Sequence, residues 1–195
     1  ERFKLQESLV EEYGYTLIPP FNDYRIMAGQ GTVGLEILEQ LPDVDHIFVP
    51  TSGGGLIGGI GTAVKESTDK VKIHGVEPAN LPKFSESLKN GELTQVENKG
   101  TIADGLVSII PGEKNFPVVQ KYVDTFHTVS EEAMKKGQKL MLMEAKILTE
   151  ISSSIAIGGI LNGEIEVNPE DKVCFVITGG NLGFDQLDYI KDTEY

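Results

Sequence analysis

Cysteine, long apolar runs and positive charge are all scarce in this sequence. Of its 195 residues only Cys174 is a cysteine, so the chain can form no internal disulfide. We expect a cytoplasmic protein in which this residue is a small buried hydrophobe. No apolar run approaches the roughly 18 residues of a membrane span, and no signal peptide is visible at the start. These absences predict no membrane partner.

Basic residues are outnumbered by acidic ones. The 17 Lys and Arg residues face 30 Asp and Glu residues, which gives a net charge of -13. Nucleic acids and anionic membranes both reward clustered positive charge, so neither is expected as a main partner. A phosphate group held locally by backbone amides remains compatible with this balance. The first residue is Glu1 within an apparent helix, so we expect a fragment or a processed product.

Strand-like and helix-like segments alternate along the chain. Short apolar runs predict strands, and longer amphipathic segments predict helices. The expected strands are residues 15–21, 45–50, 70–78, 125–129 and 172–180, and the main expected helices are 32–41, 55–66, 82–90, 116–123 and 151–161. Ser130 is expected to cap a further helix. This order predicts an α/β fold, with three layers built on a mainly parallel, twisted sheet flanked by helices.

Three consecutive glycines stand between a predicted strand and a predicted helix, in the stretch FVPTSGGGLIGGI from Phe48 to Ile60. In α/β folds, ligands bind beyond the carboxyl ends of strands. A helix start offers free N–H groups and a partial positive charge, and glycine lets the backbone approach an anion closely. The pattern therefore favours a phosphate cradle, with the Ser52 hydroxyl as a further donor.

Two other interpretations of the glycines stay open. In the first, the glycines serve close packing of the strand against the helix, with no ligand. In the second, the chain is a nucleotide-binding domain, because Glu77 ends a predicted strand near the spacing that the dinucleotide fingerprint requires. The glycines do not otherwise form the usual dinucleotide fingerprint, and they do not form a phosphate-binding Walker motif, because no G-K-[ST] follows.

Five motifs in chain order resemble the fold-type II pyridoxal-phosphate enzymes, in the branch of threonine/serine dehydratases (ammonia-lyases) and serine racemases. They are the segment that runs from IPPFNDYRIMAGQG through SGGGLIGGI, HGVEPAN, GTIADGLV, LTEISSSIAIGGIL and VITGGNLG. The similarity spans essentially the whole chain. It implies the large domain of a fold like that of the tryptophan synthase β-subunit, and pyridoxal 5′-phosphate as the cofactor.

The resemblance implies a set of cofactor-binding residues. The phosphate loop corresponds to Ser52, Gly53, Gly54, Gly55 and Leu56. The other implied contacts are a hydroxyl that meets the pyridine nitrogen, a carboxylate near the ring and a glycine that closes on the cofactor face. These correspond to Thr178, Glu150 and Gly105.

A hydroxyl at position 178 has chemical consequences. A carboxylate there would hold a pyridinium and make a full electron sink, whereas a neutral hydroxyl gives milder stabilisation of a carbanion. The resemblance therefore implies β-elimination, in which L-threonine or L-serine loses its Cα proton and its β-hydroxyl and yields a 2-oxo acid and ammonia. Racemisation of serine uses the same carbanion and remains an alternative.

The family's lysine and small domain have no counterpart in the sequence. Members of this family join the cofactor to a lysine far upstream of the glycine loop, yet only Lys4 precedes the loop here, in an unmatched helical context. No catalytic residue is therefore assigned. Residues 1–195 are expected to be a large-domain portion, whose partner is the missing N-terminal part of the same enzyme. Homo-oligomers are expected by analogy, and a non-catalytic binding module is the other alternative.

The remaining departures concern metal and local structure. Some relatives bind a divalent cation through a glutamate, a carbonyl four residues on and an aspartate six on. Here those positions are Glu77, Leu81 and Lys83, and the lysine leads us to expect no metal. The family's E-P-[ST]-x-G reads EISSS, which lacks the Pro and the Gly. The three histidines are expected to have structural roles within strands; they are His46, His74 and His127.

Overall fold

The structure of the chain is a computed structural model that describes residues 2–191 and 193–194, with side chains from Leu5 onward. Helices and strands alternate through most of it. The helices are α1 (Arg2–Tyr13), α2 (Tyr24–Gln40), α3 (Gly55–Ser67), α4 (Lys83–Asn90), α5 (Asn115–Tyr122), α6 (Glu131–Met143), α7 (Ile155–Leu161) and α8 (Asp188–Lys191). The strands are β1 (His46–Pro50), β2 (Lys72–Pro78), β3 (Thr125–Val129) and β4 (Val173–Phe175).

All four strands run parallel, in the order β3-β2-β1-β4. The central strand β1 is buried on both faces, and Ile47, Phe48 and Val49 are at most 1% exposed. A continuous apolar run suits such a strand, because helices cover both faces of a parallel sheet. The predicted α/β class and the parallel sheet are therefore confirmed.

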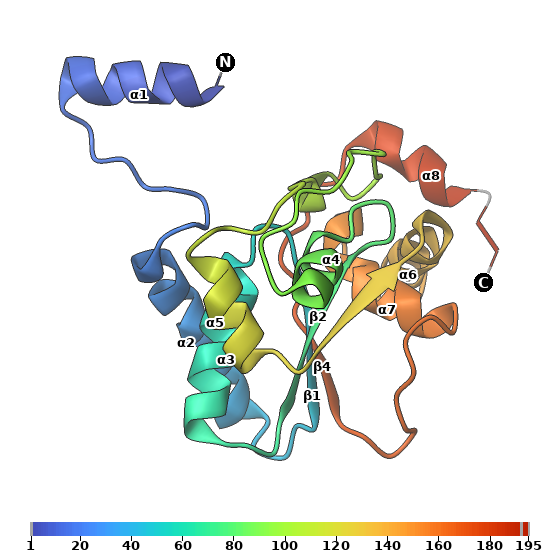
Figure 1. The fold of residues 1–195 in the computed structure, drawn as a ribbon. Coiled ribbons are helices and arrows are strands. Elements are labelled where there is room, and N and C mark those ends of the chain that lie inside the picture. Colours follow the sequence, from blue (N-terminus) through green and yellow to red (C-terminus); the bar gives the residue numbers. More distant parts are fainter. Residues whose placement is uncertain (1, 192, 195) are drawn as a thin grey trace.

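Helices pack on both sides of the sheet and give three layers (Figure 1). Alternate residues of β1 point to opposite sides: Ile47 and Val49 lie in one apolar cluster, and Phe48 lies in the other. The first cluster joins the sheet to α3 and α5, through residues such as Ile57, Ile60, Val64, Phe116 and Val119. The second joins it to α6 and α7, through residues such as Ala133, Met134, Ile155 and Ala156.

The strand order reverses beside β1. The chain moves from β1 to β2 and then to β3 in one direction, and β4 returns to pair with the other edge of β1 (Figure 1). Connections on the two sides of such a point diverge and leave a crevice beyond the carboxyl ends of the strands. In this chain that crevice lies between the segments that follow β1 and β4.

Close packing of α2 against α3 depends on small residues. A Cβ atom added to Gly59 would lie 2.2 Å from the Met27 carbonyl oxygen, and one added to Gly34 would lie 3.0 Å from the Ile60 carbonyl oxygen. Larger side chains would push the two backbones apart. The glycines in the second half of the FVPTSGGGLIGGI stretch therefore serve packing between helices.

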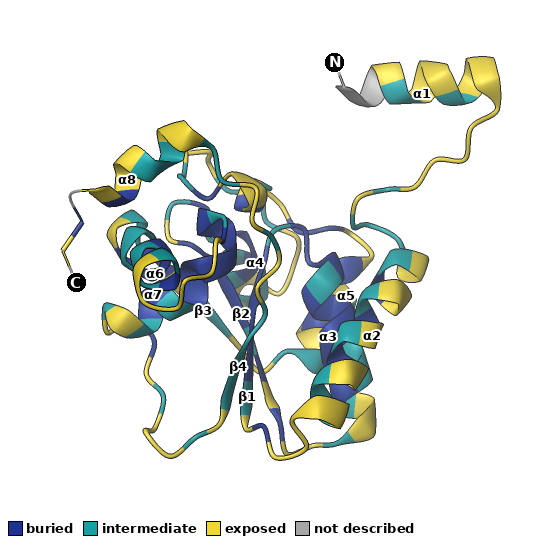
Figure 2. Cartoon of the chain, turned by 180° about the vertical axis from the view of Figure 1, so that it is seen from behind, coloured by how far each residue is buried: buried dark blue, intermediate teal, exposed yellow. Residues whose placement is uncertain are grey.

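The predicted strand at residues 15–21 is wrong. That segment is irregular, and Ile18 is 70% exposed. Pro19 and Pro20 lack the N–H groups that a strand donates to its neighbour. The segment links the body of the protein to α1, which projects away from it with an exposed surface (Figure 2). Lys4 lies within α1, but its side chain is outside the described part of the chain.

Several element boundaries also differ from prediction. Helix α2 begins at Tyr24 rather than residue 32, because the Asp23 carboxylate caps it and accepts a hydrogen bond from the Arg25 N–H. The last strand is shorter than predicted, since only Val173–Phe175 pair with β1. The Ser130 cap is confirmed by its bond from the Ala133 N–H at 3.2 Å. Among the described helices, none has the length and apolar character that crossing a membrane requires.

Candidate functional site

A cavity of about 390 Å³ opens beyond the carboxyl ends of β1 and β4. Its walls come from the glycine loop after β1, the segment before α2, two short 3-10 turns and the segment after β4. All eight residues predicted to bind the cofactor line it: Ser52, Gly53, Gly54, Gly55, Leu56, Gly105, Glu150 and Thr178. Residues that are far apart in sequence thus meet at the point where the strand order reverses.

The glycine loop lines this cavity and leads into the start of α3. Gly54 precedes α3 with φ at +94°, a conformation that residues with a side chain rarely adopt. The first bond within the helix runs from the Gly58 N–H to the Gly54 carbonyl. The N–H groups of Gly55, Leu56 and Ile57 therefore have no acceptor within the helix, and they provide an anion site at its positive end.

Hydrogen bonds outside the cavity hold the loop in place. The Gly53 carbonyl accepts bonds from the Gly112 N–H at 2.9 Å and from the Asn115 side-chain amide at 2.8 Å. The Ser52 hydroxyl oxygen accepts a long bond of 3.4 Å from the Ser108 N–H. Its own hydrogen stays available to donate. The loop's carbonyl is thus satisfied by protein, and donors remain for a ligand.

Packing also requires two of the loop glycines. A Cβ on Gly53 would lie 2.4 Å from the Phe21 ring, and a Cβ on Gly54 would lie 2.5 Å from Phe84 Cζ. These glycines therefore serve packing against Phe21 and Phe84, and the alternative of strand-against-helix packing with no ligand stays open. Packing does not account for the N–H groups of Gly55 and Leu56, which have no acceptor within the helix and belong to residues that line the cavity. Packing and anion binding both follow from the same backbone conformation.

Hydroxyl groups support the part of the cavity wall that Thr178 forms. The Thr178 and Ser153 hydroxyl oxygens are 3.0 Å apart, and Ser153 Oγ also accepts a bond of 2.8 Å from the Gly179 N–H. Ser153 has a single hydrogen, which it can give either to the Gly179 carbonyl at 3.0 Å or to Thr178. When Ser153 donates to Thr178, the Thr178 hydrogen is free to reach an acceptor in the cavity.

A carboxylate lies beside this wall. A Cβ on Gly179 would come within 2.7 Å of Glu150 Oε2, so the glycine leaves the space that Glu150 occupies. The Asn181 N–H donates to the same carboxylate oxygen at 3.3 Å. On the neighbouring turn, the Gly105 N–H donates to the Ser152 hydroxyl at 2.9 Å. Glu150 and Gly105 are neighbours, because a Cβ on Gly105 would lie 3.6 Å from Glu150 Oε1, and both residues line the cavity.

The family model described as "Pyridoxal-phosphate dependent enzyme" matches residues 1–179. The chain belongs to this family. It is 39% identical over 190 residues to the L-threonine ammonia-lyase of Thermotoga maritima, a match that covers 97% of this chain and 47% of that protein. The chain thus spans about half the length of this curated relative.

Solved structures of threonine deaminases and serine racemases have the same fold as this chain. The T.th. threonine deaminase superimposes with a TM-score of 0.88 and 34% identity, over 94% of this chain and 60% of that one. Maize serine racemase superimposes with a TM-score of 0.89 and 32% identity, over 96% of this chain and 58% of that one. Dehydratases and racemases, the two kinds of enzyme that the motifs resemble, are therefore both among the structural neighbours.

Pyridoxal phosphate fits the donors that the cavity presents. Backbone N–H groups at the start of α3 suit a phosphate dianion, and the Thr178 hydroxyl suits the neutral nitrogen of the ring. Both kinds of donor belong to residues that line the same cavity. A small aromatic phosphate ester has an acceptor for each of them.

Three supporting residues escaped sequence analysis. Ser153 contacts Thr178, Asn115 holds the loop, and Phe21 fills the space above Gly53. The EISSS segment gave no signal for Ser153, because the hydroxyl residue of the family's E-P-[ST]-x-G corresponds to Ser152 and position 153 is unrestricted in that motif. Nothing in the sequence distinguishes Asn115 from other polar residues at the start of a helix.

The three histidines form a row across the sheet, away from the cavity lining. His46 Nδ1 lies 2.8 Å from His74 Nε2, and His74 Nδ1 lies 3.1 Å from His127 Nε2. His46 Nε2 lies 3.1 Å from the Asp171 carboxylate. Their predicted role in packing and hydrogen bonding agrees with this arrangement, but their mutual pairing was not foreseen. Cys174 is partly buried, and burial raises the pKa of its thiol.

Proposed function

We propose that this chain is the cofactor-phosphate-binding portion of a pyridoxal-phosphate-dependent enzyme that deaminates L-threonine or L-serine to a 2-oxo acid and ammonia. The observation that carries the proposal is that the Ser52–Leu56 loop, at the start of α3, and Thr178 line one cavity. The threonine ammonia-lyase and threonine deaminase relatives support the choice of reaction.

The proposal gives each group in the cavity a task. The N–H groups of Gly55 and Leu56 hold the phosphate, and Ser52 adds a hydroxyl donor. Thr178 donates to the ring nitrogen without protonating it, because a hydroxyl is a far weaker acid than a pyridinium. Glu150 orients the ring, and Gly105 leaves room at its face. Bound pyridoxal phosphate would supply the electron-withdrawing system that makes the Cα proton of the substrate acidic.

The reaction also needs groups that the proposal places outside residues 1–195. We assign the lysine that carries the cofactor, and the small domain that holds the substrate carboxylate, to the N-terminal part of the same enzyme. The fraction of the relatives that the chain covers is consistent with this division. The upstream reading frame tests it directly: a lysine in an S-x-K-x-R-G context is expected there, and its absence would contradict the assignment.

The exposed side of the N-terminal segment supports a further contact with protein. Leu5, Tyr13, Tyr15 and Ile18 are each at least 57% exposed, in a segment that projects from the body (Figure 2). Apolar side chains gathered in this way are typical of surfaces that another part of a protein covers. We propose that the remainder of the enzyme covers them within a cytoplasmic homo-oligomer. Light scattering of the whole protein tests the oligomeric state.

A substrate assay tests the reaction. The whole protein that contains this chain is incubated with L-threonine and with L-serine, and the 2-oxo acid is measured with lactate dehydrogenase while chiral chromatography detects D-serine. Formation of 2-oxobutyrate or pyruvate is expected. D-serine without either 2-oxo acid would instead establish the racemase alternative.

A binding assay on the chain itself tests the cavity. Pyridoxine 5′-phosphate lacks the aldehyde, so it cannot react with surface lysines, and pyridoxine without phosphate is the matched control. Calorimetry is expected to show binding of the phosphate ester and much weaker binding of pyridoxine. Tight binding of NAD with no binding of pyridoxine 5′-phosphate would favour the nucleotide-binding alternative. The buried Glu77 opposes that alternative, since its carboxylate is occupied by the N–H groups of Phe84 and Ser85.

A further inference from the structure

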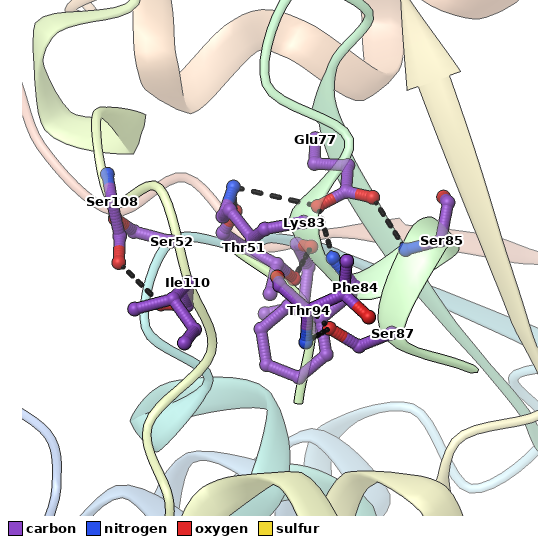
Figure 3. A network of polar contacts seen from close by, with 11 residues as sticks. Thr51, Ser52, Glu77, Lys83, Phe84, Ser85, Ser87, Thr94, Ser108 and Ile110 are labelled. Atoms are coloured by element: carbon purple, nitrogen blue, oxygen red, sulfur yellow. Dashed lines mark hydrogen bonds and ion pairs between the residues drawn. The ribbon is translucent and has the colours of Figure 1, made fainter. Parts of the chain in front are cut away.

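Two fully buried charges lie directly behind the glycine loop. Lys83 and Glu77 both have 0% exposed side chains, and Lys83 Nζ is 3.4 Å from Glu77 Oε2. The same ammonium donates a hydrogen bond of 2.8 Å to the Thr51 carbonyl oxygen. Figure 3 shows the Lys83 side chain between these two acceptors. Complete burial of a lysine is rare and costly, so its position calls for a specific role.

The surroundings of Glu77 define the charge of the pair. Its two carboxylate oxygens accept bonds from the Phe84 N–H at 3.0 Å and the Ser85 N–H at 2.8 Å, at the start of α4. The Lys83 ammonium and these two N–H groups all donate towards this carboxylate, so it serves only as an acceptor. Both groups that face Lys83 Nζ are therefore acceptors, and one of them is an anion. Burial lowers the pKa of the Lys83 ammonium, and the neighbouring Glu77 carboxylate opposes that effect.

The ammonium acts on the residue that leads into the cofactor cavity. Thr51 follows β1 and precedes Ser52; its N–H donates to the Val76 carbonyl at 2.8 Å, and its hydroxyl donates to the Val49 carbonyl at 2.9 Å. The bond from Lys83 to its carbonyl completes this set. All three polar groups of Thr51 are thus fixed, and the direction in which the loop leaves the sheet is fixed with them.

A divalent cation does not fit these residues. The glutamate and the carbonyl that some relatives use as ligands correspond to Glu77 and Leu81, but the third position is Lys83. Its ammonium faces the Glu77 carboxylate, so a metal at that carboxylate would meet a positive charge within the same buried space. The pair already supplies the cation that the carboxylate needs.

We propose that Lys83 is a tethered cation that replaces a metal ion at this position, so that the glycine loop is positioned without any free cation. Lys83 is a positioning residue in this scheme: it acts through Thr51 and touches neither cofactor nor substrate. Its removal leaves Glu77 and the Thr51 carbonyl as an anionic, oxygen-lined space. A small monovalent cation of similar size, such as ammonium or potassium, is expected to enter it.

Thermal unfolding of the chain tests the proposal without reference to catalysis. The Lys83→Met variant is compared with Lys89→Met, which removes an exposed lysine from the same helix. We expect Lys83→Met to lower Tm by about 10 °C, because an unpaired buried carboxylate remains, and Lys89→Met to change it by less than about 1 °C. Ammonium or potassium should restore part of the loss, whereas tetramethylammonium at equal ionic strength should not.

Two results would overturn the proposal. One is a saturable rise in the Tm of the unmodified chain with magnesium or calcium, which would show that a metal site persists. The other is a Lys83→Met variant whose Tm responds equally to ammonium, potassium and tetramethylammonium, which would reduce Lys83 to a packing side chain.

A second variant keeps the test decisive if Lys83→Met does not fold. The double variant Glu77→Gln/Lys83→Met contains no unpaired charge, so it is expected to fold and to show no specific response to ammonium. Its affinity for pyridoxine 5′-phosphate should fall about tenfold, because the Thr51 carbonyl has lost its charged donor. An unchanged affinity would refute the positioning role. The unmodified chain's own affinity is measured in parallel, so a failure of the proposed function is recognised separately.

Discussion

The histidine row predicts a specific loss of stability in mild acid. His46 Nε2 faces the Asp171 carboxylate, so that nitrogen carries a hydrogen and His46 Nδ1 is an acceptor. His74 Nε2 must then donate to His46, and His127 Nε2 must donate to His74 Nδ1. One tautomer of three neutral rings satisfies every bond. A proton added to His74 Nδ1 would face the N–H of His127 and break the hydrogen bond between His127 and His74.

The sign and size of the effect follow from the central ring. Burial lowers the pKa of His74 from 6.5 to about 4, and His127 and His46 add to the effect. The unfolded chain therefore takes up this proton near pH 6.5, whereas the folded chain does so only near pH 4. Stability is complete above about pH 6.5 and declines as the pH falls towards about 4. The full shift corresponds to about 3 kcal/mol, and solvent near this half-buried ring reduces it to about 1–2 kcal/mol.

Urea unfolding followed by circular dichroism at about pH 7.5 and pH 5 measures this difference. The matched variant is His74→Gln, whose amide can donate to His46 and accept from His127 but does not titrate. The unmodified chain is expected to lose about 1 kcal/mol more than the variant between the two pH values. Carboxylates with lowered pKa values, such as Asp124, stay ionised over this range and do not confuse the comparison. Equal pH dependence of the two proteins would refute the reasoning.

Three substitutions test the site and the core that supports it. Gly54→Ala places a Cβ 2.5 Å from Phe84 at a φ of +94°, so the affinity for pyridoxine 5′-phosphate, measured by calorimetry, should fall at least about tenfold. The control is Gly29→Ala on α2, where an added Cβ meets open space, and its affinity should be unchanged. Gly59→Ala places a Cβ 2.2 Å from a backbone oxygen of α2, so urea unfolding should show a loss of about 3 kcal/mol or more; a loss below about 1 kcal/mol would contradict the observed helix contact. Ser153→Ala removes the partner of the Thr178 hydroxyl, so pyridoxine 5′-phosphate should bind about threefold to tenfold more weakly, with little change in Tm. An unchanged affinity would show that Thr178 needs no such support.

Sequence patterns predicted most of the strands and helices because burial on both faces leaves a clear signal. Ile47 to Val49 are continuous apolar residues, and the glycine triplet marks where the chain leaves the sheet. Residues 15–21 misled the prediction because an apolar run can also belong to an exposed segment. Helix α2 begins before the predicted residue 32 because the Asp23 carboxylate caps it and accepts a hydrogen bond from the Arg25 N–H.

The composition of the cavity was predictable, but its supporting contacts were not. Family motifs gave the residues of the glycine loop and Thr178, which the fold brings together. The Ser153 contact depends on how a 3-10 turn at Ile151–Ser154 meets the segment after β4, which no local pattern encodes. The histidine row likewise depends on strand register: Phe48 pairs with His74, and Val76 pairs with His127, so residues spaced widely in sequence become neighbours.

The pairing of β1 with β4 has a consequence for biosynthesis. His46 pairs with Val173, so one edge of β1 stays open until synthesis has passed β4. An open edge of an apolar strand is a template for pairing with other molecules. Chains that stop before β4 should therefore aggregate rather than fold. The ligand cavity also closes late, because the wall that contains Thr178 emerges from the ribosome only after β4 has been made.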